Sequence, residues 1–176
     1  MLTPPAPYLL RPMHLPDLQA VLAIDRRSFP TPTKTSVYEY ELSHNQLAHY
    51  QVLSANETII GYGGFWLLGD ECHISTIATH PDWRRRGLGE LLLLNMLFMA
   101  NEQAAQMVTL EVRQSNLTAQ ALYHKYQFAI VGERRRYYKD TGENALIMTQ
   151  EPLNGRYYQF LLQQQTTLFA RLQNED

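Results

Sequence analysis

A strand that leads through a glycine-bearing loop into a long apolar helix constrains the fold of this chain most. The apolar run 74–79 predicts a strand, His80-Pro81 ends it, and a helix is expected from about Leu88. The loop between them reads RRRGLG over residues 84–89. The first backbone N–H groups of a helix have no intrahelical partner, glycine lets a ligand approach the backbone, and arginine adds positive charge. The segment therefore predicts a site for a phosphorylated cofactor.

Taken by itself, the loop is compatible with other interpretations. It lacks both the GxxxxGK[ST] pattern of a Walker A loop and the three-glycine GxGxxG pattern of a dinucleotide-binding turn. A run of three arginines is also more often a solvated surface segment than a ligand site. The loop becomes specific only together with other motifs.

Length and charge narrow the class of protein. A chain of 176 residues fits one domain, and 45% apolar with 18% charged residues is typical of a globular protein. The formal net charge of −2 disfavours general binding of polyanions, although six of the 15 basic residues lie in two arginine triplets, 84–86 and 134–136. We therefore expect no nucleic-acid partner.

Cysteine and histidine usage argues against metal and disulfide chemistry. Cys72 is the single cysteine, so no intramolecular disulfide can form, and the histidines show no metal-ligand spacing. The N-terminus lacks the basic and apolar regions of a signal peptide. The longest apolar run, 91–100, is interrupted at Asn95 and is too short to cross a bilayer. We expect a cytoplasmic protein with no metal and no membrane partner.

Hydrophobic periodicity predicts an α/β chain. We expect Asn56-Glu57 to form a hairpin turn. We expect the proline-rich residues 1–7 to form a loosely attached arm. The apolar residues of the helix that starts near Leu88 surround its axis, so we expect it to be sandwiched against a sheet. We assign residues 1–152 to one domain and residues 153–176 to a helical extension packed on it. The expected strands are 8–11, 48–55, 58–68, 71–79, 108–113, 128–138 and 145–149, and the expected helices 16–29, 37–44, 88–103, 117–126 and 156–172.

Several further motifs give the chain a resemblance to a known family. These are LEVRQSN at 110–116, ALYHKYQF at 121–128, RRRYY at 134–138 and ENALIM at 143–148. Together with the loop they resemble the GNAT superfamily of N-acetyltransferases, and more narrowly the bacterial ribosomal-protein alanine N-acetyltransferases of the RimI type. The resemblance covers about residues 9–152. It implies a GNAT fold, a mixed sheet of about seven strands splayed in the middle and flanked by about four helices, plus the C-terminal helical extension.

The resemblance also implies roles for individual residues. Glu111 corresponds to the family's general base and Tyr123 to its general acid, while Phe29, Pro30, Tyr137 and Tyr138 correspond to the segments that clamp an acceptor peptide. The last residues of the central strand would lie beside the pantetheine arm of acetyl-CoA. The residues implied in acetyl-CoA binding are Ile77, Ala78, Thr79, Arg84, Arg85, Arg86, Gly87, Leu88, Gly89, Glu90, Asn116 and Tyr123.

The residues themselves leave alternatives open. A strand glutamate such as Glu111 is usually a solvated surface charge, Tyr123 can belong to the core, and Asn116 can equally be a helix N-cap. Where RimI-like chains usually show Pro-Trp, this chain has Pro32-Thr33, which puts the choice of substrate in doubt. Gln127 and Asn144, which replace a common glycine and a common aspartate, are expected to be structural.

The function expected from these features is direct transfer of an acetyl group from acetyl-CoA to a protein N-terminal α-amino group, with a small-subunit ribosomal protein as a candidate acceptor. Cys72 is a poor nucleophile candidate, because the side chain of His73 should face the opposite side of the strand. An α-amine has a pKa near 7.7–8.0, far below that of lysine, so a modest base suffices. The alternatives are acetylation of a small amine or a lysine side chain, or a CoA-binding regulatory protein without turnover.

Overall fold

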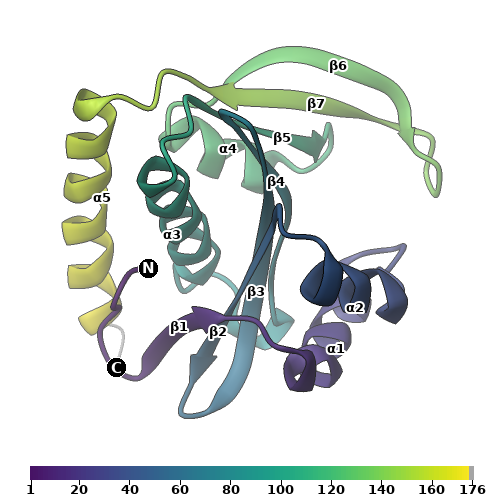
Figure 1. The fold of residues 1–176 in the computed structure, drawn as a ribbon, viewed down its shortest axis with the longest axis horizontal. Helices are drawn as coiled ribbons and strands as arrows, with labels where there is room; N and C mark the ends of the chain where they lie inside the picture. Colours follow the sequence, from purple (N-terminus) through teal and green to yellow (C-terminus); the bar gives the residue numbers. More distant parts are fainter. Residues whose placement is uncertain (175–176) are drawn as a thin grey trace.

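One seven-stranded sheet with the strand order β1-β2-β3-β4-β5-β7-β6 organises the computed structural model, which describes residues 1–174 (Figure 1). Six neighbouring pairs form it, and β4 with β5 is the one parallel pair. The predicted mixed α/β sheet is therefore confirmed. The strands are β1 (Tyr8–Pro12), β2 (Ala48–Ala55), β3 (Thr58–Leu68), β4 (Glu71–Thr79), β5 (Met107–Arg113), β6 (Ala129–Tyr138) and β7 (Glu143–Gln150).

The hairpin between β2 and β3 follows directly from its turn residues. Asn56 and Glu57 have φ values of 46° and 69°, which is the left-handed pair of a two-residue hairpin turn. β2, β3 and β4 have the bounds that the sequence predicts, because alternating apolar residues and short polar turns delimit each of them. β1 to β4 thus form an antiparallel meander of sequence neighbours.

The sheet parts in its middle, between β4 and β5. Their pairing runs from Glu71↔Met107 to Ile74↔Leu110, whereas β4 continues to Thr79 and β5 to Arg113. From Thr76 onward β4 is paired with β3 alone, and from Glu111 onward β5 is paired with β7 alone. The two halves of the sheet therefore diverge beyond Ile74, as a splayed sheet requires.

Helices cover both faces of the sheet. Figure 1 shows α3 (Leu88–Glu102) and α5 (Gly155–Gln173) on one face and α1 (Leu18–Ser28) with α2 (Thr35–His44) on the other. The short α4 (Leu117–Lys125) contributes side chains to the same core as α3. Residues 90–98 of α3 are all buried, which confirms that this helix is enclosed by the sheet and its neighbours. No helix within residues 1–174 is long and apolar enough to cross a membrane.

Two expectations about the N-terminal region are wrong. Residues 1–7 are not a loose arm, because the Leu2 N–H donates to the side-chain oxygen of Asn95 at 2.7 Å. Asn95 is fully buried in the apolar α3, and this bond together with one from its amide to Gln51 satisfies its polar atoms. The helix expected over 16–29 also starts later, since Leu15–Asp17 forms a 3-10 turn before α1.

Candidate active site

The loop from β4 to α3 presents unpaired backbone amides. Gly87 is the N-cap of α3 with φ 72°, and the first intrahelical bond runs from the Leu91 N–H to the Gly87 carbonyl at 2.9 Å. The N–H groups of Leu88, Gly89 and Glu90 precede that bond and have no intrahelical acceptor. The helix dipole adds partial positive charge at the same place. This end of α3 is suited to an anion.

The three arginines of the loop are exposed but differ in their contacts. Arg84 donates to the Thr79 carbonyl at 3.4 Å and to the Ser28 hydroxyl at 3.3 Å. The guanidinium of Arg86 lies 4.9 Å from the centre of the Trp83 ring. Arg85 has a left-handed φ of 67°, which turns the loop. The loop is therefore tied to α1 and β4 while its positive charge stays at the surface.

The two glycines of the loop are needed for different reasons. A Cβ at Gly89 would meet nothing within 4 Å, so the space beside it is open to a ligand. A Cβ at Gly87 would lie 2.6 Å from the Arg171 guanidinium and 3.2 Å from Leu168, both on α5. The left-handed backbone favours glycine at position 87, and a side chain there would have to displace the Arg171 guanidinium of the C-terminal helix, a constraint that the sequence did not reveal.

Glu90 is a buried carboxylate whose side chain is directed at α4 and α5. It accepts from Arg171 at 2.8 Å and from the Tyr126 hydroxyl at 2.9 Å, and Lys125 supplies a third contact. Burial opposes its ionisation, but these hydrogen bonds outweigh burial and leave the pKa of Glu90 lowered. The Glu90 carboxylate is bound by these protein groups, so only the backbone N–H of Glu90 is available to bind an anion.

The end of β4 lines the opening in the sheet. Ile77, Ala78 and Thr79 are paired with Gly63, Tyr62 and Gly61 of β3 on one side. On the other side the β4–β5 pairing has already ended at Ile74. Because a strand alternates its N–H and C=O groups between its two edges, this stretch directs backbone groups into the opening.

Glu111 follows the last residue of β5 that is paired with β4. Its side chain is only 10% exposed, and one carboxylate oxygen lies 2.9 Å from His73 Nε2 while the other lies 3.1 Å from the Arg134 guanidinium. The hydrogen bond from His73 lowers the pKa of Glu111, burial opposes this effect, and Arg134 adds to the lowering. Glu111 is therefore an ionised and oriented carboxylate, not a solvated surface charge.

Tyr123 and Asn116 lie on α4. Tyr123 is half-buried with its ring 5.9 Å from that of Phe128, and burial raises the pKa of its hydroxyl to about 12. The hydroxyl therefore keeps its proton at neutral pH. The exposed Asn116 is the N-cap of α4 and accepts from the Ala119 N–H at 3.1 Å.

The two segments expected to clamp an acceptor lie in contact. Thr31, in the loop that holds Phe29 and Pro30, donates to Asp140 at 3.5 Å, and Asp140 lies in the turn between β6 and β7. At the end of β6 the rings of Tyr137 and Tyr138 pack edge to face, 5.2 Å apart. The α1–α2 loop and the β6–β7 hairpin thus meet across the opening.

Two buried or half-buried residues hold these segments in place. Arg113 stacks 3.9 Å over the Tyr138 ring and pairs with Asp140 at 2.6 Å and Glu143 at 3.4 Å. On the other side Asp25, fully buried, accepts the Thr33 N–H at 2.6 Å. Burial raises the pKa of Tyr138 to about 12, against the lowering effect of Arg113. These contacts therefore fix the positions of the α1–α2 loop and the β6–β7 hairpin.

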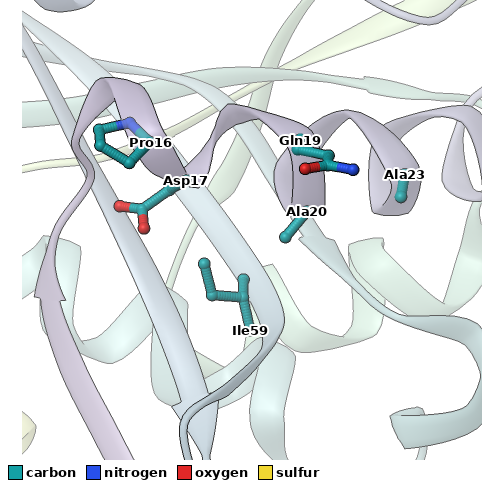
Figure 2. A pocket seen from close by; sticks show the side chains of 6 residues that line it. All are labelled: Pro16, Asp17, Gln19, Ala20, Ala23 and Ile59. Atoms are coloured by element: carbon teal, nitrogen blue, oxygen red, sulfur yellow. The ribbon is translucent and has the colours of Figure 1, made fainter.

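Other groups that could carry chemistry do not form a second site. Cys72 is fully buried, and burial raises the pKa of its thiol to about 12, so it is a poor nucleophile. Figure 2 shows a shallow hollow beside α1, but its carboxylate, Asp17, is already paired with Arg11 at 2.6 Å. In the described part of the chain no three histidine, cysteine, aspartate or glutamate side chains gather as a metal site would need. The residues that line the hollow are Pro16, Asp17, Gln19, Ala20, Ala23 and Ile59.

The fold and these residues define an acyltransferase. The model of the Acetyltransferase (GNAT) family matches residues 18–128, and the chain belongs to this family. It is an N-acetyltransferase of the RimI-like kind, by the relatives that follow.

Three proteins illustrate this similarity. A Bacillus subtilis (strain 168) protein named "Putative [ribosomal protein bS18]-alanine N-acetyltransferase" is 41% identical over 79% of this chain and 92% of its own length. N-alpha-acetyltransferase RimI of Mycobacterium tuberculosis (strain ATCC 25618 / H37Rv) is 36% identical over 69% of this chain and 76% of its own length. The crystal structure of the ribosomal-protein-S18-alanine N-acetyltransferase from Escherichia coli has a TM-score of 0.76 at 27% identity, covering 82% of this chain and 94% of that chain.

His73, Arg113 and Arg134 also lie at this candidate site, and the sequence interpretation did not single them out. The sequence draws attention to His73 only through its neighbour Cys72, and to Arg134 only as part of an arginine triplet and of the RRRYY motif. The parallel register places His73 opposite Thr109, so it shares a face with Glu111. That register depends on a pairing across the α3 crossover, and a single sequence carries no direct signal for it.

Proposed function

We propose that this chain uses acetyl-CoA to acetylate the α-amino group of a protein N-terminus. The observation that carries the proposal is the position of Glu111, an almost buried carboxylate at the point where β4 and β5 part. An amine that enters from the side of the α1–α2 loop and the β6–β7 hairpin would meet this carboxylate inside the opening. A regulatory CoA-binding protein would have no need of it.

The residues present fit acetyl-CoA. The amides of the first turn of α3 and the exposed arginines 84–86 suit a diphosphate, and the space beside Gly89 is open. The free edge of β4 at Ile77, Ala78 and Thr79 suits an extended chain with amide groups, such as a pantetheine arm. Asn116, at the start of α4, and Tyr123 would complete the binding residues on the other side.

The chemistry assigns a role to each side chain. Acetyl-CoA, when bound, supplies an activated acetyl thioester. Glu111 attracts the acceptor's ammonium group and favours loss of its proton, directly or through a water molecule. Tyr123 keeps its proton at neutral pH and would be the group that donates a proton to the thiolate when coenzyme A departs. Backbone amides of β4 are available to the carbonyl oxygen as negative charge develops on it.

A protein N-terminus is the acceptor that best suits this site. An α-amine has a pKa near 7.7–8.0, whereas lysine has one near 10.4, so the α-amine needs much less help to lose its proton. The contact of Thr31 with Asp140 bridges the two acceptor segments, which favours a narrow extended chain over a bulky amine. The Escherichia coli relative is named [ribosomal protein bS18]-alanine N-acetyltransferase, and the Bacillus subtilis relative has the same name with the word putative, which makes ribosomal protein bS18 the first candidate here.

The test is the initial rate of acetylation on a panel of peptides that differ at the first residue. An α-blocked peptide that contains lysine serves as the control. We expect free N-termini to be acetylated and the blocked peptide to be inert. Thr33 stands where RimI-like chains usually show tryptophan, so first residues beyond alanine, including serine and methionine, should also be accepted.

Each departure from this pattern has a distinct meaning. Equal rates on the blocked control and on free N-termini would replace the N-terminal function with acetylation of lysine or a small amine. A strict preference for alanine would leave the N-terminal function in place and refute the argument from Thr33. Binding of acetyl-CoA without turnover on any amine would favour a regulatory role.

A further inference from the structure

The Glu111 carboxylate is held by a pair of cationic groups of different kinds. His73 Nε2 lies 2.9 Å from one oxygen, and the guanidinium of Arg134 lies 3.1 Å from the other. Arg134 is a permanent charge on an exposed side chain, 53% accessible, whereas the His73 side chain is 20% exposed and can lose its proton near neutral pH. One partner of Glu111 is therefore constant and the other is titratable.

The surroundings of His73 fix its ring and favour its charged form. The ring stacks on Trp66 of β3, with the ring centres 5.7 Å apart and the planes within 23°. Its second nitrogen, Nδ1, faces Glu71 of the same strand at 3.8 Å. The hydrogen bond with Glu111 raises the pKa of His73 most, Glu71 adds to the rise, and burial and Arg134 oppose it. His73 therefore changes charge above the usual value of about 6.5.

We propose that His73 is a positioning residue, which orients the Glu111 carboxylate and adjusts its affinity for the acceptor's proton. This inference rests on the proposed function, in which Glu111 is the base. When His73 is protonated, Glu111 faces two cations and binds a further proton weakly. When His73 is neutral, one of these cations is gone and Glu111 becomes the stronger base. Loss of a proton from His73 should thus activate the site as the pH rises.

This arrangement reduces the difference in pKa between the base, Glu111, and the α-ammonium group of the substrate. A carboxylate with an ordinary pKa near 4.3 lies about three units or more below an α-ammonium group, and two neighbouring cations widen that gap. The neutral imidazole narrows the gap at the pH where the α-amine itself begins to lose its proton. Both groups then favour the reaction over the same pH range.

The central experiment compares His73→Gln with the wild-type protein in kcat across about pH 6 to 9, with peptide and acetyl-CoA saturating. The glutamine amide can still donate to Glu111 but does not titrate. The acceptor's own titration is common to both proteins, so the ratio of their kcat values isolates His73. We expect this ratio to change by up to about tenfold through one step above pH 6.5, since a change of about one unit in the pKa of a base alters the rate by at most about tenfold. A ratio that is constant over the range overturns the inference.

Two control variants sharpen this comparison. Arg134→Gln removes the permanent cation, so it should shift the level of kcat without adding a step to the ratio. His49→Gln removes another half-buried histidine of the sheet, which stacks on Phe65 at 4.9 Å and has no carboxylate partner within residues 1–174. The His49 variant should leave both the value of kcat and its dependence on pH unchanged. A step of the same size in the His49 variant would contradict the assignment to His73.

A double variant tests whether His73 acts through Glu111. If it does, His73→Gln should have no further effect on kcat in a Glu111→Gln background. Independent, multiplicative losses would overturn the inference. Should His73→Gln fail to fold, the pKa of His73 followed by NMR in the wild type and in Glu111→Gln gives the same information. The value should fall in the variant, and an unchanged value would overturn the inference.

These outcomes are separable from a failure of the proposed function. If the wild type acetylates no free N-terminus, or if Glu111→Gln keeps the full wild-type rate, the proposed function itself fails. If the wild type is active and Glu111→Gln is impaired while the His73 ratio stays constant, only the role of His73 fails.

Discussion

Glu90 and Glu111 are two nearly buried carboxylates, each bound by cations, yet their surroundings give them different roles. Their side chains are 8% and 10% exposed, so burial does not distinguish them. Glu90 accepts from Lys125, Arg171 and the Tyr126 hydroxyl, and none of these partners is a histidine. Glu111 instead borders the opening in the sheet and has a titratable partner in His73. The partners of a buried carboxylate, more than its burial, decide whether it can exchange a proton.

The positions of Glu90 and Glu111 in the fold support this difference in role. The contacts of Glu90 join α3, α4 and α5 on one face of the sheet, and those of Glu111 join β4, β5 and β6 on the other face. We propose on this basis that the C-terminal helix is an integral part of the acetyltransferase domain. Arg171 of that helix donates to Glu90 and occupies the space that a side chain at Gly87 would need.

The strongest test of the comparison is the effect of each carboxylate on turnover. Glu111→Gln should reduce kcat by about 10²–10⁴, the range of a positioned acid or base, with little change in the affinity for acetyl-CoA. Glu90→Gln should leave kcat within about twofold of the wild type below its unfolding temperature. Steady-state kinetics with saturating peptide measures both. If the two variants lose the same activity, the division into a chemical and a structural carboxylate is wrong.

A second pair of variants applies the same comparison to two tyrosines. Tyr123→Phe should slow the chemical step by a similar factor of about 10²–10⁴, whereas Tyr126→Phe removes a donor to Glu90 and should act on stability. The pKa of Tyr123 is about 12, so its hydroxyl should cause no loss of rate on the alkaline side up to about pH 9. Single-turnover rates for both variants over this range provide the measurement.

The cofactor loop is tested at Gly89, where a side chain meets no protein atom. Gly89→Glu should weaken the calorimetric affinity for acetyl-CoA by about 100-fold or more through repulsion of the diphosphate, while the free energy of unfolding changes little. Gly155→Glu is the matched control, because Gly155 also begins a helix and has open space around it. Gly87→Glu is less informative, since it disturbs the packing of α5. An unchanged affinity in a folded Gly89 variant would remove the diphosphate from this loop.

The smallest effect is expected in the stability that Glu90 provides. Glu90→Gln should lower the free energy of unfolding by about 2 kcal/mol, less than for a fully buried pair, because Lys125 and Arg171 can reach water. The folded-state pKa of Glu90 is lowered, so its contribution is complete above about pH 4.3 and is lost as the pH falls through the folded-state value. Denaturant unfolding should therefore show a difference from the wild type that shrinks as the pH falls below about 4.3. Glu39→Gln, on the exposed side of α2, is the control.

Local features of this molecule could be predicted from the sequence, and features that depend on distant pairs could not. The turn at Asn56-Glu57 and the N-cap at Asn116 are set by a few adjacent residues, and both are as expected. The direction of the Glu90 side chain depends on Arg171, 81 residues away, and the docking of Leu2 depends on Asn95, 93 residues away. The resemblance pointed to Glu111 and Tyr123 because their motifs are contiguous, whereas His73 joins Glu111 only through the β4–β5 register.

The single parallel pair of strands also bears on where the sheet is weakest. The antiparallel neighbours on either side of it, β3 with β4 and β5 with β7, are paired along most of their length. β4 and β5 are joined by only four pairs, from Glu71↔Met107 to Ile74↔Leu110, fewer than any other two neighbouring strands of the described sheet. We therefore expect local opening of the sheet to begin at this pair. The part of the sheet that opens most easily is then the part whose opening would hold the substrates.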